Sequence, residues 1–320
     1  MRILALIPGG IGDQILFFPT LKDLKAKYPE ATIDVMVEPR AKGAYRVCAW
    51  VKDVLNFNFK DRNGLADYMN LLGVIREKEY EVCLTLGRRW TVGLLLWLNG
   101  IPTRIGYETE PSWFLTNTVP LKTEQYAAHM YHDLLMGLGI NEPCEKPEIN
   151  VPKPDIDWAE GEQKSLGIKD TGYILIHGGS SQLAQTKGID KIYPVAHWQK
   201  IITDIQTKQP DLPVVMIQGP EDAQLVTEIQ AQCPQIKIVQ PGDIGKLAAM
   251  IAGSNLMLCT DSAPMHLSIA VGTYTIALFG PTDAKKLVPP DYDNCVAIQS
   301  PSGVIGDIKP EQVLEAIWRG

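Results

Sequence analysis

The sequence lacks the usual signs of a membrane protein or a nucleic-acid-binding protein. None of its 320 residues lies in a stretch approaching the roughly 20 uninterrupted apolar residues that a membrane-spanning helix needs. The first apolar run ends after a strand's length at Pro8-Gly9-Gly10, too early for a signal peptide, so we expect a cytoplasmic protein. Lys and Arg number 30 against 37 Asp and Glu, and the resulting net charge of −7 argues against a nucleic-acid partner.

Metal-binding and disulfide patterns are also missing. The six cysteines lie far apart, at 48, 83, 144, 233, 259 and 295, without a C-x-x-C pair. Most fall in apolar runs, which predicts buried thiols in a reducing compartment. Two D-x-D triplets, Asp155-Ile156-Asp157 and Asp291-Tyr292-Asp293, follow prolines, so turn and cap roles are favoured over a cation site. We therefore predict no metal and no cofactor.

The sequence does contain a regular alternation of apolar runs and helical patterns. In the first half, runs at 2–7, 32–37, 53–57, 81–86 and 103–107 are separated by helical patterns at 13–27, 63–78 and 90–99, with another at 124–138. In the second half, runs at 173–177, 213–218, 236–239, 255–260 and 274–279 alternate with helical patterns at 195–208, 221–232, 243–252 and 264–271. Such alternation predicts parallel sheets with helices on both faces.

A proline-rich segment at 143–154 breaks both periodicities and separates the two halves. We therefore predict an α/β protein with two doubly wound, Rossmann-like domains, 1–150 and 151–320, facing a central cleft. The last helix is expected to pack back on the N-terminal domain. Ligands of such folds bind at the carboxyl ends of the strands, which places the site in the cleft.

Two loops at predicted strand ends suit an anionic ligand. The strand that ends at Thr260 runs into Asp261-Ser262-Ala263-Pro264-Met265-His266, where the N-terminus of a helix offers free N–H groups and a positive dipole end. The strand that ends at Ile7 runs into a glycine-rich loop, in which Gly10 and Gly12 supply conformational freedom, and then reaches Asp13. From the residues alone, a helix-capping role is favoured for Asp13, since Asp is among the preferred capping residues.

Three blocks of the sequence resemble glycosyltransferase family 9, the ADP-heptose:lipopolysaccharide heptosyltransferases. The first is Ile7-Pro8-Gly9-Gly10-Ile11-Gly12-Asp13, and the second is His177-Gly178-Gly179-Ser180-Ser181 with Lys191-Ile192-Tyr193-Pro194. The third joins the Asp261–His266 segment to Phe279-Gly280-Pro281-Thr282-Asp283. The resemblance implies a GT-B fold and an inverting, metal-independent transfer of a heptose-type sugar. The donor would be a nucleotide-sugar, ADP-linked by resemblance, and the acceptor a lipopolysaccharide core or another glycan.

The resemblance also implies roles for individual residues. Asp13 matches the catalytic base. Lys191 matches a phosphate-binding lysine, with Lys187 as a rival in the same loop, and either Glu221 or Asp222 would hold the ribose. The remaining donor-binding positions are Ser180, Ser181, Asp261, Ser262, Ala263 and His266.

The acceptor side is expected in the N-terminal half. Arg88, Arg89 and Arg104 lie near predicted strand ends and are candidates for contacting an anionic glycan or glycolipid. A glycolipid acceptor would bring peripheral contact with the inner membrane face. The sequence does not reveal which sugar or acceptor is used, nor the oligomeric state.

Three alternative functions stay open. A nucleotide-sugar epimerase uses the same two-domain fold, and a non-catalytic nucleotide-sugar-binding protein would share the motifs. An NAD-dependent dehydrogenase is weaker, because Gly9-Gly10-Ile11-Gly12 lacks the G-x-G-x-x-G spacing. Two departures from the family pattern, Ala263 for glycine and Tyr274 for proline, weaken the assignment of ADP-heptose as donor.

Overall fold

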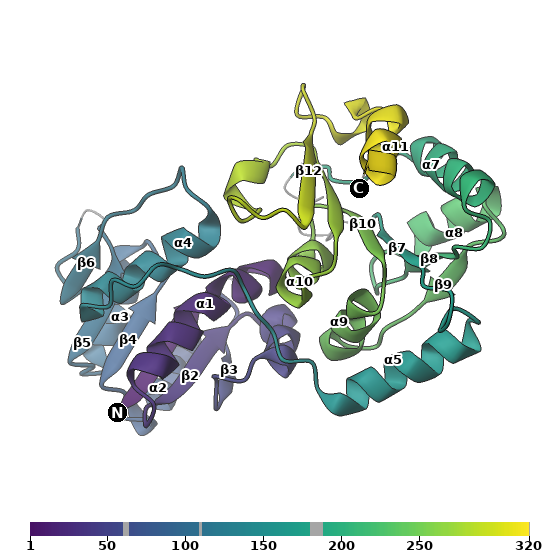
Figure 1. Cartoon of the computed structure of the whole chain (residues 1–320). Helices are drawn as coiled ribbons and strands as arrows, with labels where there is room; N and C mark the ends of the chain where they lie inside the picture. The colour runs from purple at the N-terminus through teal and green to yellow at the C-terminus, as the bar shows by residue number, and fades with distance from the viewer. Residues whose placement is uncertain (60–63, 109–110, 180–187, 320) are drawn as a thin grey trace. The chain divides into compact units, whose positions relative to one another are not determined.

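The computed structural model describes residues 1–59, 64–108, 111–179 and 188–319. Contacts divide the chain into two units, Met1–Asn150 and Val151–Gly320, coloured purple to teal and teal to yellow in Figure 1. Each unit is a parallel sheet covered by helices, so the predicted pair of doubly wound α/β domains is confirmed. That the two domains face a common cleft remains a prediction.

The sheet of the first unit is entirely parallel in the described residues, with the order β3-β2-β1-β4-β5-β6. Its strands are β1 (Arg2–Ile7), β2 (Thr32–Val37), β3 (Val54–Asn56), β4 (Val82–Thr85), β5 (Thr103–Tyr107) and β6 (Asn117–Val119). The winding direction reverses between β1 and β4. In open α/β sheets of this topology, ligands bind at the carboxyl ends of the two strands on either side of such a reversal.

Helices cover both faces of this sheet. They are α1 (Ile11–Lys27), α2 (Leu65–Glu77), α3 (Trp90–Leu98) and α4 (Ala127–His132), with the 3₁₀ helices η1 (Pro39–Val47) and η2 (Asp133–Leu138). Helix α1 packs with α4, η1 and η2. Helices α2 and α3 instead pack over Leu4 and Leu6, alternate residues that point to one face of β1.

The second unit repeats the same topology. Its parallel sheet has the order β12-β11-β10-β7-β8-β9, so the winding reverses between β7 and β10. The strands are β7 (Ile174–His177), β8 (Val214–Ile217), β9 (Lys237–Val239), β10 (Leu256–Thr260), β11 (Thr275–Phe279) and β12 (Cys295–Gln299). Counted along its own chain, each unit therefore has the strand order 3-2-1-4-5-6 of dinucleotide-binding folds.

The helices of the second unit also form two layers. They are α5 (Lys153–Ser165), α7 (Val195–Lys208), α8 (Ala223–Gln232), α9 (Ile244–Ala252), α10 (Ala263–Val271) and α11 (Pro310–Arg319), with η3 (Ala284–Lys286) and η4 (Ile305–Asp307). Helix α9 packs against α5 and α10. Helix α11 packs against α7, where the Trp318 indole N–H donates to Asp204 Oδ1 at 2.9 Å. The expected packing of α11 on the N-terminal domain stays a prediction.

Two details differ from the sequence-based expectation. Helix α5 begins at Lys153, inside the segment interpreted as a linker, because Pro152 precedes the helix and Pro154 lies in its first turn, where a missing N–H has no helical acceptor to lose. The edge strands β6 and β12 were not predicted. No helix in the described part of the chain has both the length and the apolar character needed to cross a bilayer.

Candidate functional site

The loop after β1 holds Asp13 at the reversal point of the first sheet. Helix α1 begins at Ile11 with Gly10 as N-cap, so Asp13 is the third residue of the helix and Gly12 lies in its first turn, not in the loop as predicted. The Gly10 N–H donates to Asp13 Oδ2 at 2.7 Å. The loop's unusual conformation falls on Gly9, whose φ is +141° and at which a Cβ would overlap the Asp13 carboxylate. The loop backbone therefore packs directly against this side chain.

Tyr131 holds the other oxygen of Asp13. The Tyr131 hydroxyl donates to Asp13 Oδ1 at 3.0 Å, and its ring packs near Phe17 with centroids 6.2 Å apart. Burial of the hydroxyl, the charge of Asp13 and the hydrogen bond to it raise the pKa of Tyr131 well above its usual value. The Tyr131 hydroxyl therefore keeps its proton, and remains a donor to Asp13, well above neutral pH. Each carboxylate oxygen accepts one hydrogen bond here and keeps a further lone pair.

Two of the predicted acceptor arginines lie beside this site. Arg88 and Arg89 follow β4, the strand next to β1 across the reversal point, and both are exposed. Burial dominates the raised pKa of Tyr131, and the positive charge of Arg88 opposes that rise. Arg88 thus acts electrostatically on the residue that binds Asp13.

Arg104 lies in a different place and has a different role. It is the second residue of β5, at the amino end of the strand, whereas Asp13 and Arg88 follow carboxyl ends. Its guanidinium donates to the carbonyl oxygens of Phe114 at 2.6 Å, Pro102 at 3.3 Å and Ile101. These bonds fix a backbone turn, so the structure gives Arg104 a structural role and separates it from the predicted acceptor contacts.

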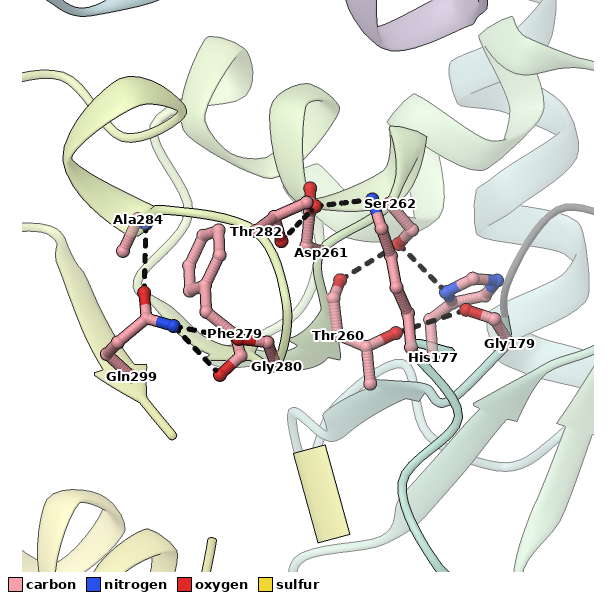
Figure 2. Close-up of polar contacts among 11 residues, drawn as sticks. His177, Gly179, Thr260, Asp261, Ser262, Phe279, Gly280, Thr282, Ala284 and Gln299 are labelled. Atoms are coloured by element: carbon pink, nitrogen blue, oxygen red, sulfur yellow. Dashed lines mark hydrogen bonds and ion pairs between the residues drawn. The ribbon is translucent and has the colours of Figure 1, made fainter. Parts of the chain in front are cut away.

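Asp261 lies at the reversal point of the second sheet, directly after β10. Its side chain is 5% exposed, and its Oδ2 accepts the Lys191 ammonium at 2.5 Å and the Thr282 hydroxyl at 2.8 Å. Figure 2 shows Asp261 facing Thr282. An ammonium has three N–H donors, so Lys191 keeps donors for a second anion. The structure thus joins two residues that the sequence proposed separately.

Ser262 and Asp222 are linked through His177. Ser262 Oγ lies 3.1 Å from His177 Nδ1 and 3.0 Å from the Thr260 carbonyl oxygen (Figure 2). On the other side of the ring, His177 Nε2 lies 3.2 Å from Asp222 Oδ2, which also accepts the Gly219 N–H at 3.0 Å. The imidazole therefore bridges the loops that follow β7, β8 and β10.

This network determines what Asp222 does. Burial opposes ionisation of Asp222, but the His177 hydrogen bond, the charge of His177 and the Gly219 N–H outweigh it and lower the pKa of the carboxyl. Asp222 is 7% exposed and packs so closely that a Cβ at Gly179 would overlap it. Glu221, in contrast, is exposed. The buried Asp222 braces the loops, which leaves Glu221 as the accessible acid at this position.

The remaining predicted residues divide into two groups. Ser262 is the N-cap of α10, Ala263 follows it in the first turn, and His266 is buried one turn further on. Ser180, Ser181 and the rival Lys187 lie outside the described residues. Sequence reasoning had not assigned roles to His177, Thr282 or Tyr131. The first two belong to the quoted motif blocks, whereas no local signal marks Tyr131, which is 118 residues from Asp13.

Comparisons with known proteins point to one family. The family model described as glycosyltransferase family 9 (heptosyltransferase) matches residues 69–308. Lipopolysaccharide heptosyltransferase 3 of Escherichia coli is 26% identical over 293 residues, covering 85% of this chain and 81% of its own. The solved E. coli heptosyltransferase WaaC with ADP superposes with a TM-score of 0.77 at 17% identity, covering 100% of this chain and 99% of its own.

A third relative carries a different name. The photosynthetic NDH subunit of subcomplex B 1 of the Arabidopsis thaliana chloroplast is 24% identical over 339 residues, covering 96% of this chain and 71% of its own. Sequences of this kind are therefore found in proteins with very different names.

Proposed function

The chain belongs to glycosyltransferase family 9, and from that premise we propose that it transfers a heptose-type sugar from a nucleotide-sugar to a glycan acceptor, with inversion and without a metal ion. The observation that carries this proposal is the pair of reversal points. One holds a carboxylate fixed by two donors, and the other holds a lysine beside a helix N-terminus. A base and a diphosphate-binding group are the two requirements of this reaction.

Asp13 is the proposed base. Its carboxylate accepts the proton of the acceptor hydroxyl while that oxygen forms a bond to the anomeric carbon of the donor sugar. The bond between that carbon and the diphosphate oxygen breaks, and the electron pair leaves with the nucleoside diphosphate. Attack from the face opposite the leaving group inverts the configuration. The Gly10 and Tyr131 contacts support this role because they hold the carboxylate in one orientation before substrate arrives.

Fixed positive groups stabilise the leaving diphosphate in this proposal. Lys191 supplies a full charge, and the N-terminus of α10 supplies backbone donors and a dipole, with the Ser262 hydroxyl beside them. Ser180 and Ser181 remain proposed diphosphate contacts on the basis of the motif. The exposed Glu221 is the proposed partner of the ribose hydroxyls, since Asp222 is committed to His177.

Arg88 and Arg89 are the proposed acceptor contacts. Both are exposed and follow the strand beside the Asp13 loop, which suits an anionic glycan or glycolipid. We place the reaction in the cytoplasm, where nucleotide-sugars are made. The presence of ADP in the WaaC structure supports an ADP-linked donor for the present protein.

A donor panel tests the first half of this proposal. ADP-, GDP- and UDP-sugars are compared at one common concentration, at which a sugar present at about 100 times its dissociation constant stabilises the protein by roughly 2.7 kcal/mol and a sugar that does not bind leaves the thermal midpoint unchanged. We expect the ADP-sugar to give the largest shift. Transfer with that donor should then continue in EDTA. Complete loss of transfer in EDTA, restored by Mg²⁺ or Mn²⁺, would exclude the metal-independent mechanism.

The Arabidopsis relative is named as a subunit of a photosynthetic NDH subcomplex and not as a transferase, which makes a nucleotide-sugar-binding protein of the same fold the second candidate function. The same panel distinguishes the two functions. Donor binding without release of nucleoside diphosphate, on any lipid or glycan acceptor offered, would support the binding protein. Product analysis separates a transferase from the third possibility, an epimerase, because an epimerase would return an isomerised nucleotide-sugar with its bond to the sugar intact.

A further inference from the structure

Helix α3 exposes a group of large aromatic side chains on the first unit. Trp90 is 47% exposed and Trp97 is 52% exposed, while Trp113, in the segment before β6, is 83% exposed. Leu98 adds a further apolar side chain at the end of α3, with 44% of its surface exposed. Together with the half-buried Phe114, these residues form what we call the tryptophan surface. Exposed apolar side chains in such a group usually mark an interaction site.

The tryptophan surface is an ordered platform. Trp90 and Trp97 are seven residues apart on α3, so they lie on the same face about 10 Å apart along the axis. The Phe114 ring packs against both. Its centroid lies 6.3 Å from that of Trp90, in a stacked arrangement, and 5.7 Å from that of Trp97. Gly93 makes this contact possible, because a Cβ there would lie 3.1 Å from Phe114 Cβ. The aromatic rings therefore hold one another in place while their outer faces meet solvent.

Arginines border this surface. Arg89 immediately precedes Trp90 as the N-cap of α3, and Arg76 donates to the Leu98 carbonyl oxygen at 3.0 Å. Arg104 donates to the Phe114 carbonyl oxygen at 2.6 Å. Residues 82–107 contain three arginines and no Asp, Glu or Lys. Although the whole protein has a net charge of −7, the stretch that carries α3 is positive, with Glu81 just before it and Glu108 just after it.

We propose that the tryptophan surface docks on an anionic phospholipid bilayer. Tryptophan is enriched at membrane–water interfaces, where its ring enters the acyl boundary and its N–H stays among the headgroups. Arginines at the rim match the negative surface of a bilayer, and each basic residue near such a surface strengthens binding roughly fivefold. Trp and Arg are also enriched at protein–protein interfaces, so a second copy of the chain is the alternative that the test below distinguishes.

Docking in this way concerns the acceptor substrate. Arg88 lies one residue before Arg89, the N-cap of α3, and its charge acts on Tyr131, which binds Asp13. The tryptophan surface and the proposed base are thus connected through one short loop of the same unit. A lipid-anchored acceptor could remain in the bilayer while its glycan reaches Asp13.

Vesicle binding tests the proposal without requiring any transfer reaction. The probes are large vesicles of phosphatidylcholine alone and of phosphatidylcholine with phosphatidylglycerol, and binding is measured by co-sedimentation of the full chain. We expect binding to the anionic vesicles only, weakening as salt is raised. Brominated lipids should quench part of the fluorescence of the seven tryptophans. The double variant Trp97→Ala/Trp113→Ala should bind the anionic vesicles at least about tenfold more weakly than the wild type, because it loses two interfacial rings.

Matched variants complete the test. Ile156→Ala/Val304→Ala removes two exposed apolar side chains of the second unit and should bind vesicles like the wild type. Trp113→Ala alone serves if the double variant fails to fold. The proposal is overturned if the wild type does not bind anionic vesicles, or if the folded Trp97→Ala/Trp113→Ala variant binds them as strongly as the wild type. A dimer in solution that the tryptophan changes convert to a monomer also overturns it, because a second copy would then cover the surface. Since no donor or acceptor is present, these outcomes are independent of the proposed transfer.

Discussion

Asp13→Asn is the substitution that best separates a catalytic carboxylate from a structural one. In the wild type, Asp13 Oδ2 accepts the Gly10 N–H at 2.7 Å and Oδ1 accepts the Tyr131 hydroxyl at 3.0 Å. Asparagine offers one oxygen and one NH₂ group. Its oxygen can keep the Gly10 contact, and its NH₂ group can donate to the Tyr131 oxygen once the hydroxyl proton has rotated away.

The change should therefore cost little stability and much activity. Two charge-assisted hydrogen bonds become neutral ones and a favourable helix-dipole interaction is lost, together about 1–2 kcal/mol for a partly exposed group. Turnover should fall by roughly 10²–10⁴-fold, because an amide cannot accept the proton of the acceptor hydroxyl. Donor affinity should persist, since the proposed donor contacts belong to the other unit.

Calorimetric titration of the donor and a coupled assay of nucleoside diphosphate release with a lipopolysaccharide-core acceptor measure these two quantities. Tyr131→Phe is the matched control, because it removes one of the two contacts and leaves the carboxylate. We expect it to lower turnover by about tenfold, as for loss of one orienting hydrogen bond. An Asp13→Asn protein with turnover close to that of the wild type would remove Asp13 from the mechanism.

Three further predictions follow from the second unit. Lys191→Ala should weaken donor binding by about 1.5–3 kcal/mol, the usual worth of a hydrogen bond to a charged group, and Lys187→Ala by less; calorimetry giving the reverse order would refute the assignment. Gly179→Ala should lower thermal stability by about 1–3 kcal/mol, because its methyl group would overlap the Asp222 carboxylate, whereas Gly242→Ala, with open space around it, should be tolerated. Asp222→Asn should lower the free energy of unfolding at pH 7. Thermal unfolding should show the difference from the wild type shrinking as the pH falls from about 4 through the lowered pKa of Asp222, because the wild-type carboxylate is then protonated as well. A stability difference that does not change with pH would contradict this role.

The central strands could be predicted because their burial is almost complete. Five of the six residues of β1 are buried, and all four of β7 are, so each strand contains an uninterrupted apolar run, residues 3–7 in β1 and 174–176 in β7, where the buried His177 follows it. The edge strands behave differently. Strand β6 has two exposed residues out of three, and its short sequence Asn117-Thr118-Val119 does not differ from a loop. Strand β12 does carry an apolar run, Cys295-Val296-Ala297-Ile298, which the sequence analysis did not interpret as a strand; each of its residues is partly buried or exposed.

The site was predictable where a motif was local and unpredictable where a contact was distant. Asp261 and Lys191 were each proposed from a motif, but their ion pair joins residues 70 positions apart and depends on the fold. Arg104, which the sequence grouped with Arg88 and Arg89, lies apart from them for a different reason. Proximity to a strand end does not say which end, and in a parallel sheet only the carboxyl ends line the ligand crevice. Because β5 begins at Thr103, Arg104 lies at the opposite edge.

The backbone at Gly9 determines when the entropy of orienting the Asp13 carboxylate is lost. Only glycine readily adopts a backbone φ of +141°, and glycine loses more conformational entropy on folding than any other residue. Because Gly9 has no Cβ, the loop backbone packs directly against the Asp13 carboxylate and blocks its rotation on that side. The orientation of the carboxylate is therefore fixed once, when the protein folds, and not again at each turnover. Reorganisation of the base should consequently add little to the activation barrier, whatever sugar or acceptor occupies the site.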